Sequence, residues 1–225
     1  MNNINENFGI NNKENSFTVI KIIVLLIVLQ IIRIILKQSV FLFLPHNKFN
    51  DVLISMIIMV ILTLFIIYKT KQDRITLDIF SHMKNKESKV YYFMVTVGIL
   101  LLIFTSPFFL TNPSIETLLP LIYTTVMIPI YEEIIFRSYI WNILQKENMK
   151  EIKIYFLTTL LFSAYHIGYI DTIIAINGFN NMALIIFIKC SIMLSYGIFI
   201  GFFKYKIKNS YSCMLIHSFI NIFGG

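Results

Sequence analysis

Residues 130–141 read IYEEIIFRSYIW, and this stretch decides how the rest of the chain is interpreted. It lies inside an apolar segment, residues 118–143, that is longer than the about 20 helical residues needed to cross a membrane core. It nevertheless carries Glu132, Glu133 and Arg137. Ionisable groups at such a depth cost at least about 2.5–3.5 kcal/mol each, so they usually face a bundle interior or a wet cavity. The stretch therefore predicts a membrane-spanning helix with a polar inner face.

Similar apolar runs recur along the whole chain. Of its 225 residues, 57% are hydrophobic and 14% charged, whereas soluble domains are about 45–50% apolar and about 25% charged. The composition predicts an all-α, polytopic transmembrane helical bundle of about seven spans. The spans are expected near 18–43, 52–68, 90–110, 118–143, 153–170, 182–203 and 210–223. A short apolar piece at 172–176 is expected to be re-entrant or interfacial, which would make an eighth membrane segment.

The chain divides into three parts on this basis. Residues 1–17 are polar and rich in Asn, which predicts a flexible N-terminal tail. The first apolar run is too long for a signal-peptide core and is followed by no small-residue cleavage site, so we expect it to be retained as a helix. Residues 18–110 form the N-terminal transmembrane helices, and residues 118–225 form a core that carries the polar motifs.

Basic residues are concentrated in alternate loops. The loops 69–89, 144–152 and 204–209 are rich in Lys and Arg, whereas the loops 44–51, 111–117 and 171–181 contain Lys48 as their one basic residue. Basic loops stay on the cytoplasmic side of a membrane. This alternation predicts a multi-pass cell-membrane protein with a cytoplasmic N-terminus and an external C-terminus. It also accounts for the net charge of +7 without a nucleic-acid partner.

Prolines and glycines mark where helices should break or approach closely. Pro107, Pro113, Pro120 and Pro129 cluster around the third and fourth spans, where they should break or kink the helices. Gly197 and Gly201 form a small-xxx-small pair, which is typical of close helix packing.

The polar residues of the spans form three clusters. Glu132, Glu133 and Arg137 lie in the fourth predicted span, His166 in the fifth, and His217 with Asn221 in the seventh. Counted from the predicted cytoplasmic ends at 1.5 Å per residue, Glu132 and His166 lie roughly 17–20 Å deep, and the last pair roughly 10–17 Å deep. The three clusters are therefore expected to meet at one level, nearer the cytoplasmic half.

Helical spacing assigns different tasks within the clusters. Residues four apart share a helix face, so Glu133 can pair with Arg137, and His217 and Asn221 can contact one small group. Glu132 is rotated by about 100° from Glu133, which allows one carboxylate to be structural while the other faces a cavity. Phe162, four residues before His166, is expected to hold the His166 ring or to shape the pocket.

A carboxylate beside an imidazole can take a proton from water, and a second His with an Asn can donate hydrogen bonds to an oxyanion. Hydrolysis of a peptide bond inside the membrane matches these groups best. Two His and one Glu are also familiar zinc ligands, so Glu132, His166 and His217 are a candidate zinc set. The chain contains no HExxH or GxSxG motif, and its cysteines, Cys190 and Cys213, form no CxxC pair or disulfide framework.

The three clusters resemble the motifs of a known family. EEIIFR (residues 132–137), FSAYH (162–166) and HSFIN (217–221) match the EExxxR, FxxxH and HxxxN motifs in that order. They are similar to those of the CPBP family of intramembrane proteases, also called the Abi or CAAX-protease family. It includes type II CAAX prenyl endopeptidases and proteins tied to bacteriocin processing and self-immunity.

The resemblance implies an intramembrane endopeptidase, of the metallo- or glutamate type, that acts on a membrane-associated peptide or protein. Glu132 and His166 would activate water, His217 and Asn221 would stabilise the oxyanion, and Glu133, Arg137 and Phe162 would support them. The Ile, Asn and Lys bias of the chain indicates an AT-rich bacterial gene, for which a peptide precursor is a better substrate than a prenylated protein. Two alternatives stay open: a non-proteolytic immunity or scaffold protein, and a proton-coupled transporter.

Overall fold

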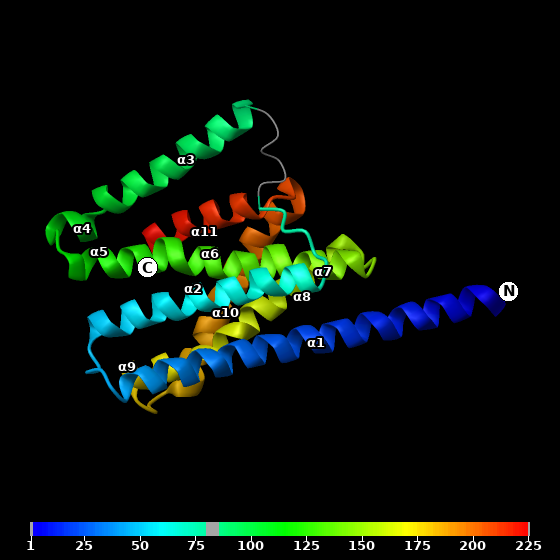
Figure 1. The fold of residues 1–225 in the computed structure, drawn as a ribbon, viewed down its shortest axis with the longest axis horizontal. Helices are drawn as coiled ribbons and strands as arrows, with labels where there is room; N and C mark the ends of the chain where they lie inside the picture. The colour runs from blue at the N-terminus through cyan, green and yellow to red at the C-terminus, as the bar shows by residue number, and fades with distance from the viewer. Residues whose placement is uncertain (1, 80–85, 225) are drawn as a thin grey trace.

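The computed structural model of the protein describes residues 2–79 and 86–224, and in them it contains helices and no strands (Figure 1). This confirms the predicted all-α class. The α-helices are α1 (Asn2–Phe41), α2 (Lys48–Gln72), α3 (Lys86–Thr105), α4 (Pro107–Thr111), α5 (Ile115–Ile122), α6 (Ile128–Glu133), α7 (Trp141–Lys146), α8 (Glu151–Tyr165), α9 (Ile170–Asn177), α10 (Met182–Ile207) and α11 (Ser210–Gly224). Two π-helical stretches, η1 (Tyr123–Met127) and η2 (Ile134–Ile140), and a 3₁₀ turn, η3 (His166–Tyr169), join some of them.

Five stretches are long and apolar enough to cross a membrane. They are Ser16–Phe41, Lys48–Gln72, Glu87–Thr111, Ile115–Lys146 and Met182–Ile207. The other two predicted spans are shorter helices, α8 and α11, of 15 residues each. The segment 172–176 is part of the short helix α9, which continues from α8 through η3. Helix α1 begins at Asn2, and the flexibility expected for residues 1–17 stays a prediction.

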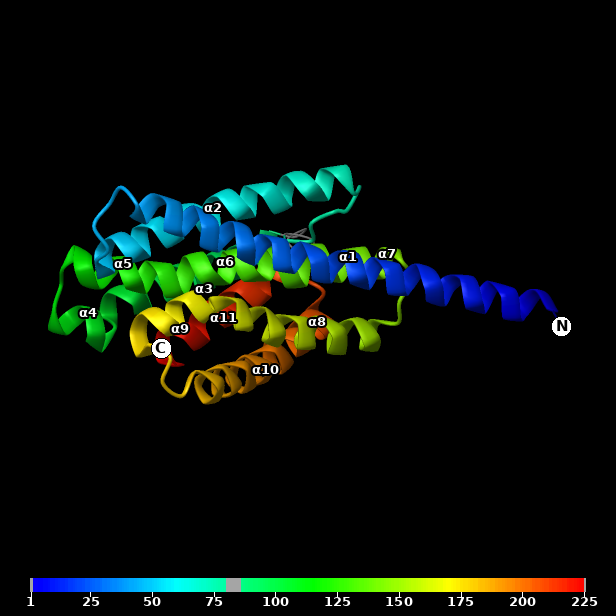
Figure 2. The ribbon, with the colours of Figure 1, turned by 90° about the horizontal axis from the view of Figure 1, so that it is seen from below.

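The helices lie roughly along one direction, as two perpendicular views show (Figures 1 and 2). Helices α1 and α2 pack together, α8 packs along α10, and α11 contacts α6, η1 and α3. The main core lies between α1, α2, α6, η2, α7 and α8, and its largest fully buried apolar side chains include Trp141, Tyr131 and Phe136. Many large apolar side chains on the outside are exposed, as expected for a surface whose solvent is lipid.

The prolines act only partly as the sequence predicts, because Pro107 stands at a helix break whereas Pro120 and Pro129 lie within a continuous helical rod. Helix α3 ends at Thr105, and α4 begins at Pro107 after Ser106, whose hydroxyl accepts a hydrogen bond from the Phe109 N–H. The wide turn η1 lies between Pro120 and Pro129. Because proline lacks an N–H and its ring clashes with the carbonyl of residue i−4, a wider turn accommodates it without ending the helix. The chain from 115 to 146 therefore remains one continuous helical rod.

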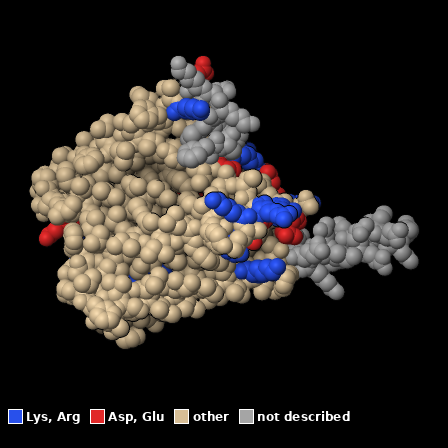
Figure 3. Space-filling model, in the orientation of Figure 1, with Lys and Arg blue, Asp and Glu red and all other residues tan. Residues whose placement is uncertain are grey.

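The basic loops gather at one end of the bundle. Lys146 Nζ donates to the Asp73 carbonyl over 2.8 Å, and Lys208 Nζ lies 2.5 Å from Glu151 Oε2. These contacts join all three loops that the sequence marks as basic, although Lys84 lies outside the described residues. On the face drawn in Figure 3, charged atoms gather at this end and the rest is largely uncharged. The loops share one side, which alternation of the spans requires.

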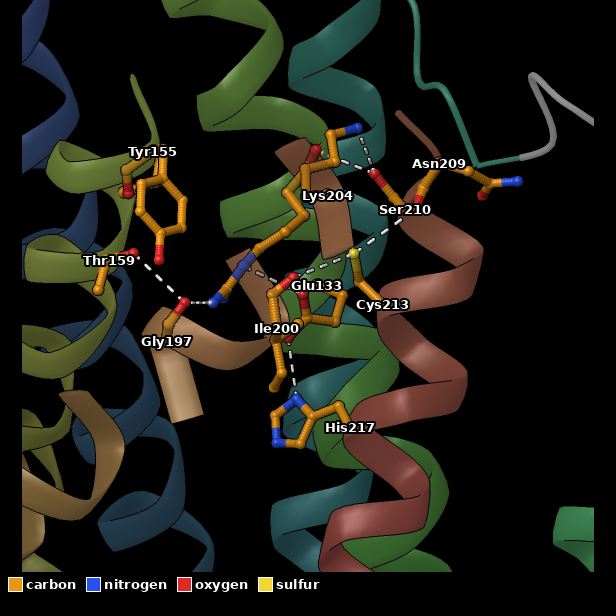
Figure 4. Close-up of polar contacts among 12 residues, drawn as sticks. Glu133, Tyr155, Thr159, Gly197, Ile200, Lys204, Asn209, Ser210, Cys213 and His217 are labelled. Carbon is orange, nitrogen blue, oxygen red and sulfur yellow. Dashed lines mark hydrogen bonds and ion pairs between the residues drawn. The ribbon is translucent and has the colours of Figure 1, made fainter. Parts of the chain in front are cut away.

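The loop after α2 is fastened to this end by a buried polar cluster. Asp78 accepts hydrogen bonds from Ser138 and Ser210 (3.1 and 2.8 Å) and forms an ion pair with Lys204. Figure 4 shows Ser210 beside Lys204, and Ser210 Oγ also donates to the carbonyl oxygen of Arg137 over 2.9 Å. The cluster connects the loop, α10 and the start of α11 to the stretch that carries the motif glutamates.

Candidate active site

The motif glutamates lie where the helical rod changes its winding. Glu132 and Glu133 end α6, and the π-helical stretch η2 begins directly after them and contains Arg137. All three residues are buried. A π-helical stretch turns the chain by less per residue than an α-helix, and such stretches are frequent at functional sites. The change of winding lets adjacent glutamates and the arginine all point into the bundle.

Glu132 and His166 form the first pair of the site. Glu132 Oε1 lies 3.5 Å from His166 Nε2, and both side chains are almost fully buried. His166 Nδ1 lies 2.9 Å from the carbonyl oxygen of Phe162. A carbonyl oxygen can only accept, so this nitrogen carries the proton. Nε2 is therefore the ring atom that faces the carboxylate and can exchange a proton with it or with a molecule between them.

Glu133 forms a second, separate pair with His217. Its Oε1 lies 2.9 Å from His217 Nδ1, and Figure 4 shows the imidazole of α11 turned toward it. Glu133 Oε2 lies 3.3 Å from Arg137 Nε, an ion pair whose atoms are not aligned for a hydrogen bond. The expected pairing of Glu133 with Arg137 is present, and the contact with His217 was not expected.

Arg137 is held in place by contacts beyond the carboxylate. Its Nη2 donates to the carbonyl oxygen of Gly197 over 3.4 Å. Figure 4 shows that this carbonyl also accepts from Thr159 Oγ1. Its guanidinium lies 4.4 Å from the centre of the Phe162 ring. Phe162 in turn contacts His166 edge-on, with ring centres 4.9 Å apart. The phenylalanine thus connects the arginine and the first histidine, as its predicted supporting position requires.

Asn221 lies apart from these pairs. Its Nδ2 donates to the carbonyl oxygen of Thr124, 2.8 Å away, in the wide turn η1. His217 and Asn221 were expected to grip one small group, but here they have different partners. The prediction assumed that residues 123–127 form a regular α-helix. In the π-helical stretch η1, the carbonyl oxygen of Thr124 is instead available to accept from the Asn221 amide.

A buried cluster on α1 completes the surroundings of His166, and the three motifs do not include it. Arg33 Nη2 donates to the Gly168 carbonyl (2.8 Å), and the same guanidinium pairs with Asp171 at 2.6 Å. Gln30 Nε2 donates to the Tyr165 carbonyl (3.0 Å). These bonds hold the turn η3 that carries His166. A charged residue in the middle of the first apolar run was the one sequence signal for this cluster.

The side chains of the candidate zinc set belong to two different pairs. Glu132 lies beside His166, and His217 contacts Glu133 through Nδ1, which engages only one of its two ring nitrogens. Within residues 2–79 and 86–224, no group of three or more His, Cys, Asp or Glu side chains is placed to hold a metal ion. In this arrangement the three side chains do not form a three-ligand centre, and the zinc set stays a prediction.

The fold and the site define a class of protein, an all-helical membrane protein with paired glutamate and histidine side chains buried among its helices. Residues 114–223 match the family model described as type II CAAX prenyl endopeptidase Rce1-like. This match agrees with the family that the three motifs predicted, and that family implies protease activity. Neither the curated proteins nor the solved structures give a significant match.

Proposed function

We propose that this protein is an intramembrane endopeptidase in which Glu132 and His166 activate the water that cleaves the peptide bond. The observation that carries the proposal is the geometry of this pair. Its two facing atoms are 3.5 Å apart, and the other ring nitrogen of His166 is fixed by the Phe162 carbonyl. A separation of this size is too long for a strong direct hydrogen bond and leaves room beside the pair for a water bonded to both.

The proposed reaction proceeds through a tetrahedral intermediate. Water attacks the carbonyl carbon of the scissile bond and gives its proton to the Glu132–His166 pair. A C–O bond forms, and the carbonyl oxygen becomes an oxyanion. When the C–N bond breaks, the pair returns the proton to the departing nitrogen, so that a new carboxyl group and a new amine are the products. General acid–base catalysis by such a pair contributes about 10²–10⁴-fold to a rate.

The second pair would orient and stabilise. Glu133 accepts a hydrogen bond from His217 Nδ1, and when both ring nitrogens of His217 carry a proton, Nε2 can donate toward the oxyanion. Arg137 balances the charge of Glu133, and Phe162 connects that arginine to His166. The oxyanion role predicted for Asn221 stays a prediction, and it requires the amide to exchange the Thr124 carbonyl for the substrate.

The proposed substrate is a membrane-associated peptide or protein cleaved toward the cytoplasmic half of the bilayer. Support comes from the burial of the catalytic pair among lipid-facing helices and from the family description, which names CAAX prenyl endopeptidases. The Ile, Asn and Lys bias of the chain, which indicates a bacterial gene, favours an unmodified peptide precursor over a prenylated one.

The test uses purified protein reconstituted in liposomes. A panel of membrane peptides, containing a prenylated CAAX peptide and unmodified hydrophobic precursors, is incubated with the wild type and with Glu132→Ala. Mass spectrometry then identifies new peptide termini. We expect wild-type protein to cleave at least one class at a defined bond and Glu132→Ala to cleave none. Cleavage by both would refute the mechanism, and cleavage by neither would favour the immunity or scaffold alternative.

A further inference from the structure

The Tyr169 hydroxyl stands out among the buried polar groups around His166. Tyr169 is the last residue of the turn η3 that begins at His166, and its side chain is buried. Its hydroxyl has no hydrogen-bond partner within the described part of the chain, and neither does Glu132 Oε2. Buried polar groups are nearly always paired in native proteins, so an unpaired one needs a functional explanation.

The position of Tyr169 places it at the catalytic pair. Its ring centre lies 5.5 Å from that of His166, and the two planes are tilted by 33°. Its hydroxyl also interacts electrostatically with Glu132. By contrast, the neighbouring Tyr165 hydroxyl is already engaged, 2.6 Å from that of Tyr131. Tyr165 directly precedes the turn η3 and Tyr169 ends it, and of the two only Tyr169 has a hydroxyl available for another molecule.

Two cations contact the Tyr169 ring. The Arg33 guanidinium lies 4.5 Å and Lys189 Nζ 4.8 Å from the ring centre. A cation over a ring face is attracted to the ring, so these two contacts hold the ring in place. Arg33 also holds the Gly168 carbonyl and Asp171 on either side of the tyrosine. The ring is therefore fixed in place beside the catalytic pair, with a hydroxyl that has no partner within the described residues.

We infer that Tyr169 is a further catalytic residue, whose hydroxyl donates a hydrogen bond to the oxyanion formed from the scissile carbonyl. Preorganised donors of this kind act most strongly in sites without bulk water. Arg33, which lies outside the matched residues 114–223, is a positioning residue that acts through Tyr169. The inference rests on the proposed function and gives the N-terminal helix α1 a part in it.

The test compares Tyr169→Phe with Tyr165→Phe, a matched loss of one hydroxyl from the residue that directly precedes the turn η3. The substrate is whichever panel peptide the wild type cleaves. Removing an oxyanion donor lowers kcat by about 10²–10³-fold, so we expect a loss of that size in Tyr169→Phe with KM within about twofold. Tyr165→Phe should keep kcat within a few-fold of wild type. Their unfolding temperatures should show the opposite order, because only Tyr165→Phe breaks a hydrogen bond that exists in the folded protein.

The outcomes separate this inference from the proposed function. If Glu132→Ala is inactive but Tyr169→Phe keeps wild-type kcat, the role of Tyr169 is wrong and the proposed function stands. If kcat of Tyr169→Phe falls and its unfolding temperature falls as far as that of Tyr165→Phe, the role of Tyr169 is structural, and the inference is also overturned. If Glu132→Ala cleaves like wild type, both proposals fail.

Discussion

Glu132 and Glu133 are adjacent in the sequence but have different histidine partners. Glu132 lies 3.5 Å from His166 of η3, and Glu133 lies 2.9 Å from His217 of α11. Glu133 has the additional ion pair with Arg137, so it compensates a buried positive charge. The two carboxylates should consequently respond differently to the same substitution, one in catalysis and the other in stability.

The change Glu133→Gln should destabilise the folded protein. It keeps the shape of the side chain but leaves the Arg137 guanidinium without its counter-charge, and removing one partner of a buried pair costs about 3–5 kcal/mol. The free energy of unfolding, measured by denaturant titration in micelles, checks this. Glu116→Gln on the same helical rod is the control because Glu116 is exposed; such a change usually stays within about 0.5 kcal/mol. Equal stabilities for the two variants would contradict the assigned pairing.

The local spacing of residues predicted part of the site. The four-residue interval predicted the Glu133–Arg137 pair and the contact of Phe162 with His166, and both are present. The contact of Glu133 with His217 and the bond of Asn221 to Thr124 were missed. Both depend on the wide turns η1 and η2, and regular helical counting gives the wrong direction for side chains beyond such turns. Tyr169 was missed because an aromatic residue in a span is ordinarily a core residue.

At the scale of the elements, the close contact of α8 and α10 determines the packing of Phe162, which lies beside the catalytic side chains. A methyl group added at Gly197 would lie 3.2 Å from both Phe162 and Thr159, and one at Gly201 would lie 3.0 Å from the Tyr155 ring. The small-xxx-small pattern predicted this approach correctly. Since Phe162 also contacts His166 and Arg137, the packing of α10 determines where the catalytic side chains lie.

Gly197→Ala should therefore lower stability although alanine is the better helix former. Overpacking of a tight contact costs about 1–3 kcal/mol, which exceeds the gain of up to about 1 kcal/mol in helix propensity. Gly98→Ala on α3 is the matched control, because a methyl group there meets nothing within 4 Å. Thermal unfolding of the two variants checks the sign. An equal rise in both melting temperatures would show that α8 and α10 do not approach this closely.

The loop after α2 is fastened through Asp73, which makes this end of the bundle sensitive to acid. Burial raises the pKa of the Asp73 carboxyl, but hydrogen bonds from Tyr139 and Lys69 outweigh it and hold the pKa below its usual range. A lowered pKa adds stability above the unfolded value of about 3.9, and this contribution is lost as the pH falls through the folded value. Asp73→Asn should thus reduce the melting temperature at pH 7, and the difference should disappear once the pH falls below the folded pKa of Asp73. A constant difference at every pH would contradict the link to ionisation.

For the whole molecule, the sequence predicted the class and the grouping of loops. Apolar runs of sufficient length give the helices, and alternating charge places the loops 69–89, 144–152 and 204–209 together, as the contacts of Lys146 and Lys208 show. The attachment of α1 to η3 could not be predicted, because it depends on which buried groups meet after the helices pack. Arg33 and Asp171 are 138 positions apart in the sequence.

The orientation in the membrane remains a prediction of the charge pattern and can be measured with single cysteines. In a background with Cys190 and Cys213 replaced by Ala, Asn112→Cys and Lys150→Cys introduce exposed thiols in loops expected on opposite sides. An impermeant maleimide added to intact cells should label the cysteine at 112, and the one at 150 only after permeabilisation. The reverse pattern would show that the basic end faces outward.

The central claim is that Glu132 activates the hydrolytic water, and its most direct test is the cleavage rate of Glu132→Gln on the peptide that the wild type cleaves. This substitution keeps the size of the buried side chain and removes its capacity to accept a proton. We expect kcat/KM to fall by at least about 10²-fold, with substrate binding retained and Glu116→Gln as active as wild type. A Glu132→Gln enzyme that cleaves at the rate of Glu116→Gln would contradict the account.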